Sequence, residues 1–123
     1  MTGVLIVEDS LVSQKVIKLN LEKQKGIEIV GIACNGFEAI KMTKELNPDV
    51  IIMDLCMPKM DGIEALNEII KEMNIPIIFL SAQINMKESA LSSGAVSFIE
   101  KNSENIKNIL LSDINKFARV SNK

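Results

Sequence analysis

The chain has 123 residues, of which 47% are hydrophobic, and a formal net charge of −2 with both signs interspersed. This length is typical of one domain with one core, and the charge pattern excludes a strongly basic surface for nucleic acid or anionic membranes. The absence of histidine excludes Ser-His catalysis and histidine-ligated zinc.

The apolar runs are shorter than a bilayer span, and the N-terminus lacks the pattern of a signal peptide. The two cysteines, Cys34 and Cys56, have no metal-type spacing. We therefore expect a single domain over residues 1–123, in the cytoplasm. It either acts alone or forms part of a longer protein.

Five apolar segments that are typical of buried strands alternate with five segments that have helical periodicity. We expect strands at residues 3–7, 27–34, 50–53, 76–80 and 96–99. We expect helices at about residues 11–25, 36–46, 63–73, 86–93 and 104–120. Strict alternation predicts a parallel sheet with right-handed connections and helices on both faces. We expect a flavodoxin-like (βα)5 doubly wound α/β fold with strand order 2-1-3-4-5.

Three of the helices carry finer expectations. In the first, Ser10 is the expected N-cap, and Val12, Val16 and Leu19 form the expected buried face. The fourth helix has few large apolar residues, so we expect it to be the least stable. In the last, the apolar stripe is Ile106, Leu110, Ile114 and Phe117.

Four of the five strands end in polar functional groups, namely Glu8-Asp9, Asp54, Ser81 and Lys101. In the expected order these groups meet at the carboxyl edge of the sheet, where doubly wound sheets bind ligands. Carboxylates this close together repel one another and need a counter-ion. A hard divalent cation such as Mg²⁺ binds carboxylate oxygens.

The same cluster suggests a reaction. A carboxylate such as Asp54 can act as a nucleophile toward phosphorus, with Mg²⁺ and the Lys101 ammonium stabilising the phosphoryl oxygens. The hydroxyl of Ser81 is a further donor to those oxygens.

Several motifs surround these residues: Met57-Pro58 and Asp61-Gly62 after Asp54, Ala82 after Ser81, and Gly94-Ala95 before Phe98 and Lys101. With them, the chain resembles the response-regulator receiver domains of two-component signalling over nearly its whole length. Residues 31–36 further resemble receivers of the chemotaxis methylesterase type.

The resemblance implies a phosphorylatable switch and not a conventional enzyme. Asp54 would accept a phosphoryl group from a sensor histidine kinase or phosphotransfer protein. The domain would catalyse this step and a slow dephosphorylation, and would signal to a downstream effector protein or domain. Nucleic acid and membrane are not expected as direct partners.

The resemblance also implies roles at the site. Asp9, Asp54 and the backbone carbonyl of Cys56 would bind Mg²⁺ directly, and Glu8 would act through water. Ser81 and Lys101 would contact the phosphoryl group. Phe98 would be the aromatic side chain that moves together with Ser81 on activation, although core packing explains a Phe in this strand equally well.

The sequence departs from the family at three positions: Glu8 replaces the commoner Asp, Ser81 the commoner Thr, and Asn102 the proline that usually follows the lysine. Such a proline tends to form a cis bond, so without it we expect a trans Lys101–Asn102 bond. Without that cis bond, the sequence does not predict where the Lys101 side chain lies. The alternative therefore remains a degenerate receiver that binds partners without being phosphorylated.

Two other readings are disfavoured. A flavin carrier of the same fold would need aromatic rings over the flavin, and the chain has neither Trp nor Tyr. An aspartyl-phosphate hydrolase would need an inserted cap. We expect Cys34 to be a small buried side chain, and Cys56 to be a spectator because nearby carboxylates disfavour its thiolate.

Overall fold

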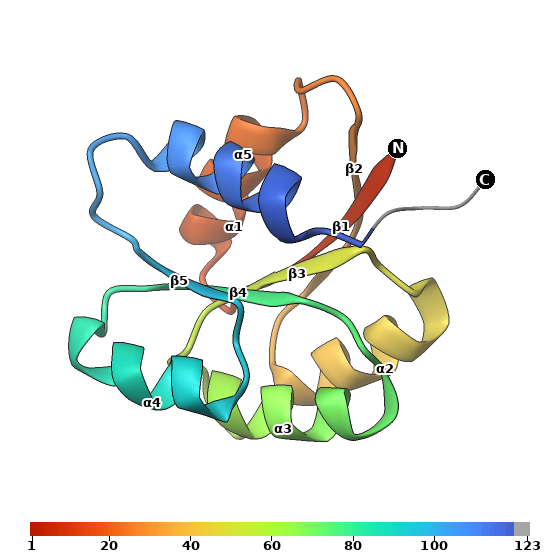
Figure 1. Ribbon diagram of the computed structural model, residues 1–123, viewed down its shortest axis with the longest axis vertical. Helices are drawn as coiled ribbons and strands as arrows, with labels where there is room; N and C mark the ends of the chain where they lie inside the picture. Colours follow the sequence, from red (N-terminus) through yellow and green to blue (C-terminus); the bar gives the residue numbers. More distant parts are fainter. Residues whose placement is uncertain (120–123) are drawn as a thin grey trace.

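The computed structural model describes residues 1–119, which form one five-stranded sheet between two layers of helices (Figure 1). The strands are β1 (Thr2–Val7), β2 (Ile27–Ala33), β3 (Val50–Met53), β4 (Ile77–Ser81) and β5 (Ser97–Glu100). All neighbouring strands are parallel, in the order β2-β1-β3-β4-β5. The predicted flavodoxin-like fold and strand order are confirmed, and each strand boundary lies within one residue of its prediction.

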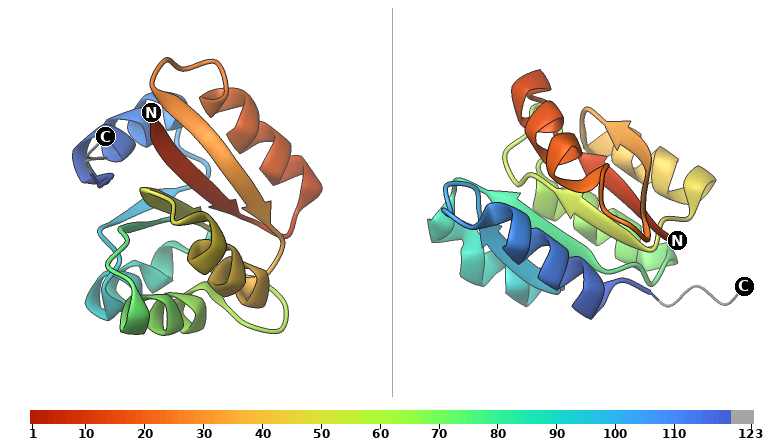
Figure 2. Two further views of the ribbon diagram at one scale, coloured as in Figure 1. Left: turned by 90° about the vertical axis from the view of Figure 1, so that its right-hand side faces the viewer. Right: turned by 90° about the horizontal axis from the view of Figure 1, so that it is seen from above.

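The helices cover the sheet unequally. They are α1 (Leu11–Leu21), α2 (Gly36–Leu46), α3 (Gly62–Glu72), α4 (Lys87–Ser93) and α5 (Ile106–Phe117), and a short 3₁₀ turn, η1 (Ile84–Met86), precedes α4. Helices α1 and α5 lie together on one face, and α2, α3 and α4 lie on the other (Figures 1 and 2). The described residues include no helix that is long and apolar enough to cross a membrane.

The central strands are buried on both faces, as their continuous apolar runs predict. In β1, Val4 and Ile6 pack toward α1 and α5, while Leu5 and Val7 pack toward the other three helices. Residues of β3 and β4 alternate in the same way, with Phe79 among the larger side chains that are fully buried. Two cores therefore fix the register of the sheet, and this register fixes which residues follow each strand at its carboxyl edge.

Helix α1 differs from its prediction in length and in orientation. It ends at Leu21 and not near residue 25, and a turn leads to Gly26, whose φ is +82°. The residues buried from α1 are Ile17 and Leu21, whereas the side chains predicted to be buried, Val12, Val16 and Leu19, are 74%, 50% and 54% exposed. The helix carries two apolar stripes, and only the docked sheet decides which of them faces inward.

The two C-terminal helices agree more closely with their predictions. Helix α4 has seven residues, contributes only Ala90 to the buried core, and ends at Gly94, whose φ of +123° favours glycine. Helix α5 begins two residues later than predicted and buries Leu110 and Ile114 of the expected stripe. The predicted end at Val120 lies outside the described residues.

Candidate functional site

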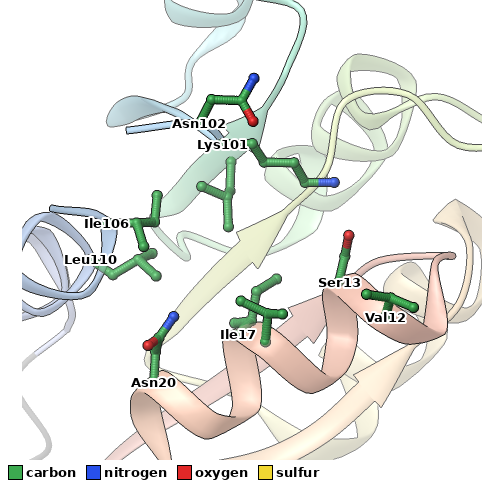
Figure 3. Close-up of a pocket in the computed structure, with 10 residues that line it drawn as sticks. Val12, Ser13, Ile17, Asn20, Lys101, Asn102, Ile106 and Leu110 are labelled. Atoms are coloured by element: carbon green, nitrogen blue, oxygen red, sulfur yellow. The ribbon is translucent and has the colours of Figure 1, made fainter. Parts of the chain in front are cut away.

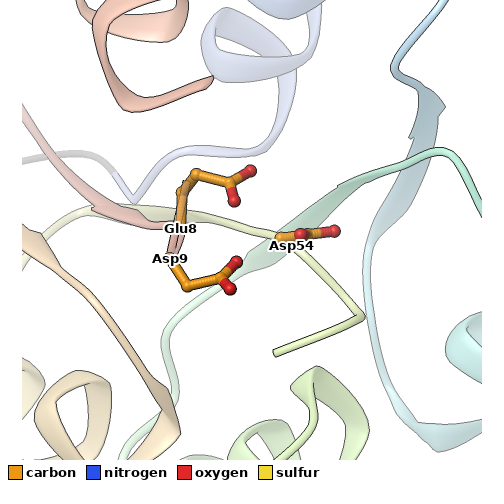
Figure 4. A group of neighbouring side chains, drawn as sticks. All are labelled: Glu8, Asp9 and Asp54. Atoms are coloured by element: carbon orange, nitrogen blue, oxygen red, sulfur yellow. The ribbon is translucent and has the colours of Figure 1, made fainter. Parts of the chain in front are cut away.

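Three carboxylates from two neighbouring strands meet at the carboxyl edge of the sheet. One oxygen from each of Glu8, Asp9 and Asp54 lies within 4.8 Å of the others, and Figure 4 shows the three side chains next to one another. Glu8 is fully buried, Asp54 is 8% exposed and Asp9 is exposed. The convergence predicted for these three acids is therefore present.

The main chain holds the acids in place by extending the sheet one residue past each strand. The N–H of Asp54 donates to the carbonyl of Val7 at 2.9 Å, and the N–H of Glu8 donates to the carbonyl of Ala33 at 2.9 Å. Ser10 then caps α1 by accepting from the Ser13 N–H, as predicted, and its own N–H donates to Glu8 Oε2 at 3.1 Å. The burial of Glu8 is thus partly compensated by a backbone donor.

Lys101 reaches the acids from the end of β5. Its N–H donates to the carbonyl of Ser81 at 2.9 Å, and its Nζ lies 2.6 Å from Glu8 Oε1 and 3.4 Å from Asp54 Oδ2. The described residues contain no cis peptide bond, so the Lys101–Asn102 bond is trans, as predicted. Lys101 therefore contacts the acids although no proline follows it in the sequence.

The electrostatics of this pair favour a charged lysine. Burial opposes the ammonium, but the hydrogen bond to Glu8 and the attraction of Asp54 outweigh it and raise the pKa of Lys101. Burial also raises the pKa of Glu8, although the hydrogen bonds from Lys101 and from Ser10 N–H oppose this shift. A partly buried ammonium–carboxylate pair therefore lies directly beside Asp54.

Ser81 lies at the same edge, and its hydroxyl oxygen accepts a hydrogen bond within its own turn. The residue is fully buried, and its Oγ accepts from the N–H of Gln83 at 3.0 Å. Phe98 is half-buried against the core and lies opposite Phe79 in the sheet register. The joint movement of Ser81 and Phe98 stays a prediction.

The two cysteines are both free and exposed, so the prediction that Cys34 is buried is wrong. The last buried residue of β2 is Ala33, and Cys34 follows it at the rim, where its Sγ lies 3.7 Å from Gln14 Nε2. Burial, together with the charges of Asp54 and Asp61, raises the pKa of the Cys56 thiol, in the direction expected for a spectator.

Sequence reasoning missed Gln14. From the first turns of α1, its Nε2 donates to the carbonyl of Glu8 at 2.6 Å and so ties the helix to the acidic pair. The only sequence signal for this contact is the position of Gln14 one helical turn or more after Glu8-Asp9. A glutamine in the first turns of a helix usually faces solvent, so this signal is weak.

A cavity of about 210 Å³ opens beside the acid cluster, between α1 and α5 (Figure 3). Apolar side chains of both helices line it, including Ile17 and Leu110, and Lys101 and Asn102 lie at its border. Its lining is mostly apolar and includes none of the three acids. The groups that could bind a cation or react with phosphorus therefore lie in the acid cluster and not in this cavity.

The donor set of the cluster matches a hard divalent cation. The converging ligand atoms are carboxylate oxygens, and one ammonium leaves three carboxylates incompletely neutralised. Mg²⁺ prefers this kind of site, in which a few protein oxygens leave room for water and phosphate. The structure thus combines a cluster of acids that could hold a cation with a nearly buried carboxylate and a lysine.

Comparisons with known proteins agree with this arrangement. The sequence model of the response regulator receiver domain matches residues 4–111. A protein-glutamate methylesterase/protein-glutamine glutaminase of Lawsonia intracellularis is 41% identical over 107 residues, which cover 82% of this chain and 29% of that protein. This chain therefore spans less than a third of that relative's length, and the resemblance to methylesterase receivers is confirmed at the level of sequence similarity.

Solved structures extend the similarity to the fold. The response regulator domain of Thermotoga maritima CheB is 34% identical, with a TM-score of 0.90 and 99% of each chain covered. A chain of the CheX–CheY–BeF3–Mg²⁺ complex from Borrelia burgdorferi is 31% identical, with a TM-score of 0.83, and the match covers 96% of this chain and 90% of that one. On these grounds the chain belongs to the family of response regulator receiver domains, the regulatory domains of two-component signalling.

Proposed function

We propose that this receiver is a phosphorylatable switch in which Asp54 accepts a phosphoryl group in a Mg²⁺-dependent reaction. The observation that carries the proposal is the position of Asp54, which is 8% exposed and lies beside two further acids and one ammonium. A carboxylate that only capped a turn would not need this environment.

Asp9, Asp54 and the backbone carbonyl of Cys56 are the groups that would hold Mg²⁺ directly, with Glu8 acting through water. The ion would withdraw negative charge from the phosphoryl oxygens during transfer. The similar chain from Borrelia burgdorferi comes from a complex that contains both BeF3 and Mg²⁺, which supports a site for a cation and a phosphoryl-like group here.

The residues of this chain have distinct tasks in the transfer. A carboxylate oxygen of Asp54 attacks phosphorus, and the phosphorus–nitrogen bond of the donor's phosphohistidine breaks as imidazole leaves. The Lys101 ammonium, already 3.4 Å from Asp54 Oδ2, then pairs with a phosphoryl oxygen. The Ser81 Oγ accepts from the N–H of Gln83, which leaves its O–H proton available to donate to another phosphoryl oxygen.

The expected partners are a sensor histidine kinase or phosphotransfer protein as donor and an effector protein or domain as target. The exposed apolar side chains of α1, such as Val12 and Val16, lie near the site and suit a protein donor. The similarity to methylesterases supports an effector of that class, in which this domain would regulate an enzyme. The cytoplasmic location stays a prediction.

The experiment is labelling with acetyl phosphate, with and without Mg²⁺. We expect labelling of the wild type only with Mg²⁺, loss of labelling in Asp54→Asn, and retention in Asp61→Asn. Asp61 is the matched control because it is an acid of the same segment that caps α3, and asparagine also caps helices. Labelling of Asp54→Asn would contradict the proposal, and an unlabelled, folded wild type would favour the degenerate receiver.

A further inference from the structure

Helices α2 and α3 lie side by side on one face of the sheet and form an open groove between them (Figure 1). This α2–α3 groove has a volume of about 370 Å³, and its apolar lining consists of Phe37, Ile40 and Met60. Phe37 is 55% exposed, and the other two side chains are partly buried. Aromatic and methionine side chains are enriched at protein interfaces, so this lining suits a protein partner.

The α2 wall of the groove carries positive charge. Lys41 and Lys44 follow Phe37 and Ile40 by four residues each, so they continue the same face of the helix. Both lysines are exposed. The face of α2 that lines the groove is therefore apolar near the start of the helix and basic in its second half.

The α3 wall carries the opposite charge. Glu64 and Glu68 line the groove, and Glu72 continues their row at the same spacing of four residues. Lys71 pairs with Glu68 at 2.9 Å, which leaves this wall with more carboxylates than ammonium groups. The two walls already attract each other within one chain, because Lys44 Nζ lies 2.9 Å from Glu72 Oε2.

The two helices are parallel and lie at the same level. Each helix connects parallel strands, so both run in the same direction across the sheet. Near their starts, a β-carbon at Gly36 would touch the side chain of Met60, and near their ends Lys44 pairs with Glu72. The middle of α2 is therefore level with the middle of α3.

We infer that the α2–α3 groove is an interface with a second copy of this chain. A two-fold axis that runs along the groove places α2 of each copy over α3 of the other and keeps both helices at the same level. Lys41 of each copy then lies opposite Glu68 of the other, and this contact occurs twice. The two Phe37 side chains meet over the apolar lining. The interface does not require phosphorylation of Asp54.

The charge pattern is the reason to choose a second copy as the partner. A surface that is basic on one wall and acidic on the other becomes complementary to itself when it is rotated about an axis between the walls. Exposed ion pairs contribute little energy, so the charges set the register while the burial of Phe37 supplies most of the affinity. The groove is small, so we expect a weak dimer that forms at high protein concentration.

The first test is sedimentation of the full chain at concentrations up to about 1 mM. Interference optics are needed because the chain has neither Trp nor Tyr to absorb at 280 nm. The wild type should dimerise reversibly, and Phe37→Ser should weaken the dimer at least about tenfold. Leu19→Ser is the matched control, because Leu19 is 54% exposed on α1, and it should dimerise as the wild type does.

The second test exchanges the charges of the two walls. Lys41→Glu and Glu68→Lys should each weaken the dimer about tenfold, because each variant places like charges opposite each other twice. An equimolar mixture of the two variants should associate as tightly as the wild type, since both contacts then pair opposite charges again. Lys15→Glu, which reverses an exposed lysine of α1, is the control and should not change the association.

A wild type that stays monomeric up to about 1 mM would overturn the inference and leave the groove to a different protein. A dimer that persists in Phe37→Ser and in both charge variants would place the interface elsewhere and overturn it as well. A mixture of the two charge variants that fails to associate would contradict the two-fold arrangement. All the substituted side chains are exposed, so circular dichroism should show that each variant is folded.

Discussion

The main chain of Gly62 lies directly against the main chain of Asp54. A β-carbon at Gly62 would come within 2.6 Å of the carbonyl oxygen of Asp54 and 2.7 Å of Phe79 Cε1, and the Gly62 N–H donates to the carbonyl of Leu55 at 2.7 Å. The first residue of α3 thus packs against the end of β3 that carries the proposed phosphoacceptor.

This contact predicts that Gly62→Ala destabilises the fold. The atoms it would meet include backbone, which cannot rotate away, so we expect a loss of about 1–3 kcal/mol in the free energy of unfolding. Gly36 is the matched control, because it also begins a helix and the three atoms nearest to its added β-carbon all belong to the side chain of Met60 and none to the backbone. Urea unfolding followed by circular dichroism measures both, and equal losses would contradict the assignment.

The orientation of α1 leads to a second prediction. Ile17 is 4% exposed, whereas the neighbouring Val16 is 50% exposed. We expect Ile17→Ala to cost about 2–5 kcal/mol of unfolding free energy, because it leaves a cavity under the helix. Val16→Ala should change it by less than about 0.5 kcal/mol. If Val16→Ala were the more costly change, the helix would face the sheet as the sequence pattern predicted.

The contrast between β3 and α1 explains how much of the fold was predictable. A short apolar run such as Val50–Met53 specifies a strand buried on both faces, whichever way the strand is turned. In α1, apolar residues lie on two sides of the helix, and packing against Ile6 and its neighbours selects Ile17 and Leu21. The periodicity of the sequence therefore predicts that α1 is a helix, but it does not predict which side of the helix faces the sheet.

The candidate site shows the same limit. Strand topology brings Glu8, Asp54 and Lys101 to one edge, and the pattern of strand ends predicts this before any side chain is placed. The closer pairing of Lys101 with Glu8, the turn contact of Ser81 and the exposure of Cys34 depend on local geometry. No periodicity in the sequence encodes those contacts.

The segment after β4 leads to a third prediction. Residues 83–94 include the seven-residue α4, which contributes only Ala90 to the core. Phosphorylation that draws Ser81 and the following loop inward would shift an equilibrium that already exists in this segment and change the face formed by α4, β5 and α5. With BeF3 and Mg²⁺ as a phosphoryl mimic, we expect changed amide hydrogen exchange across residues 83–101. Unchanged exchange there would refute this coupling.

A fourth prediction concerns the Cys56 thiol. Its raised pKa, due to burial and to the charges of Asp54 and Asp61, leaves less thiolate at a given pH. The variant Asp54→Asn removes one of these charges, lowers the pKa of Cys56 and should speed its alkylation near pH 8. Mass spectrometry can follow Cys56 with Cys34 as the internal reference in each sample. A rate ratio that does not change would show that Asp54 does not influence this thiol.

The account depends most on where the phosphoryl group is attached. After reaction with acetyl phosphate and Mg²⁺, reduction with borohydride and peptide mass spectrometry can identify the modified carboxylate. We predict modification at Asp54 alone, and only in samples that contained Mg²⁺. Modification of Asp9, Glu8 or Asp61 in its place, or equal modification of Asp54 without a divalent cation, would contradict the account.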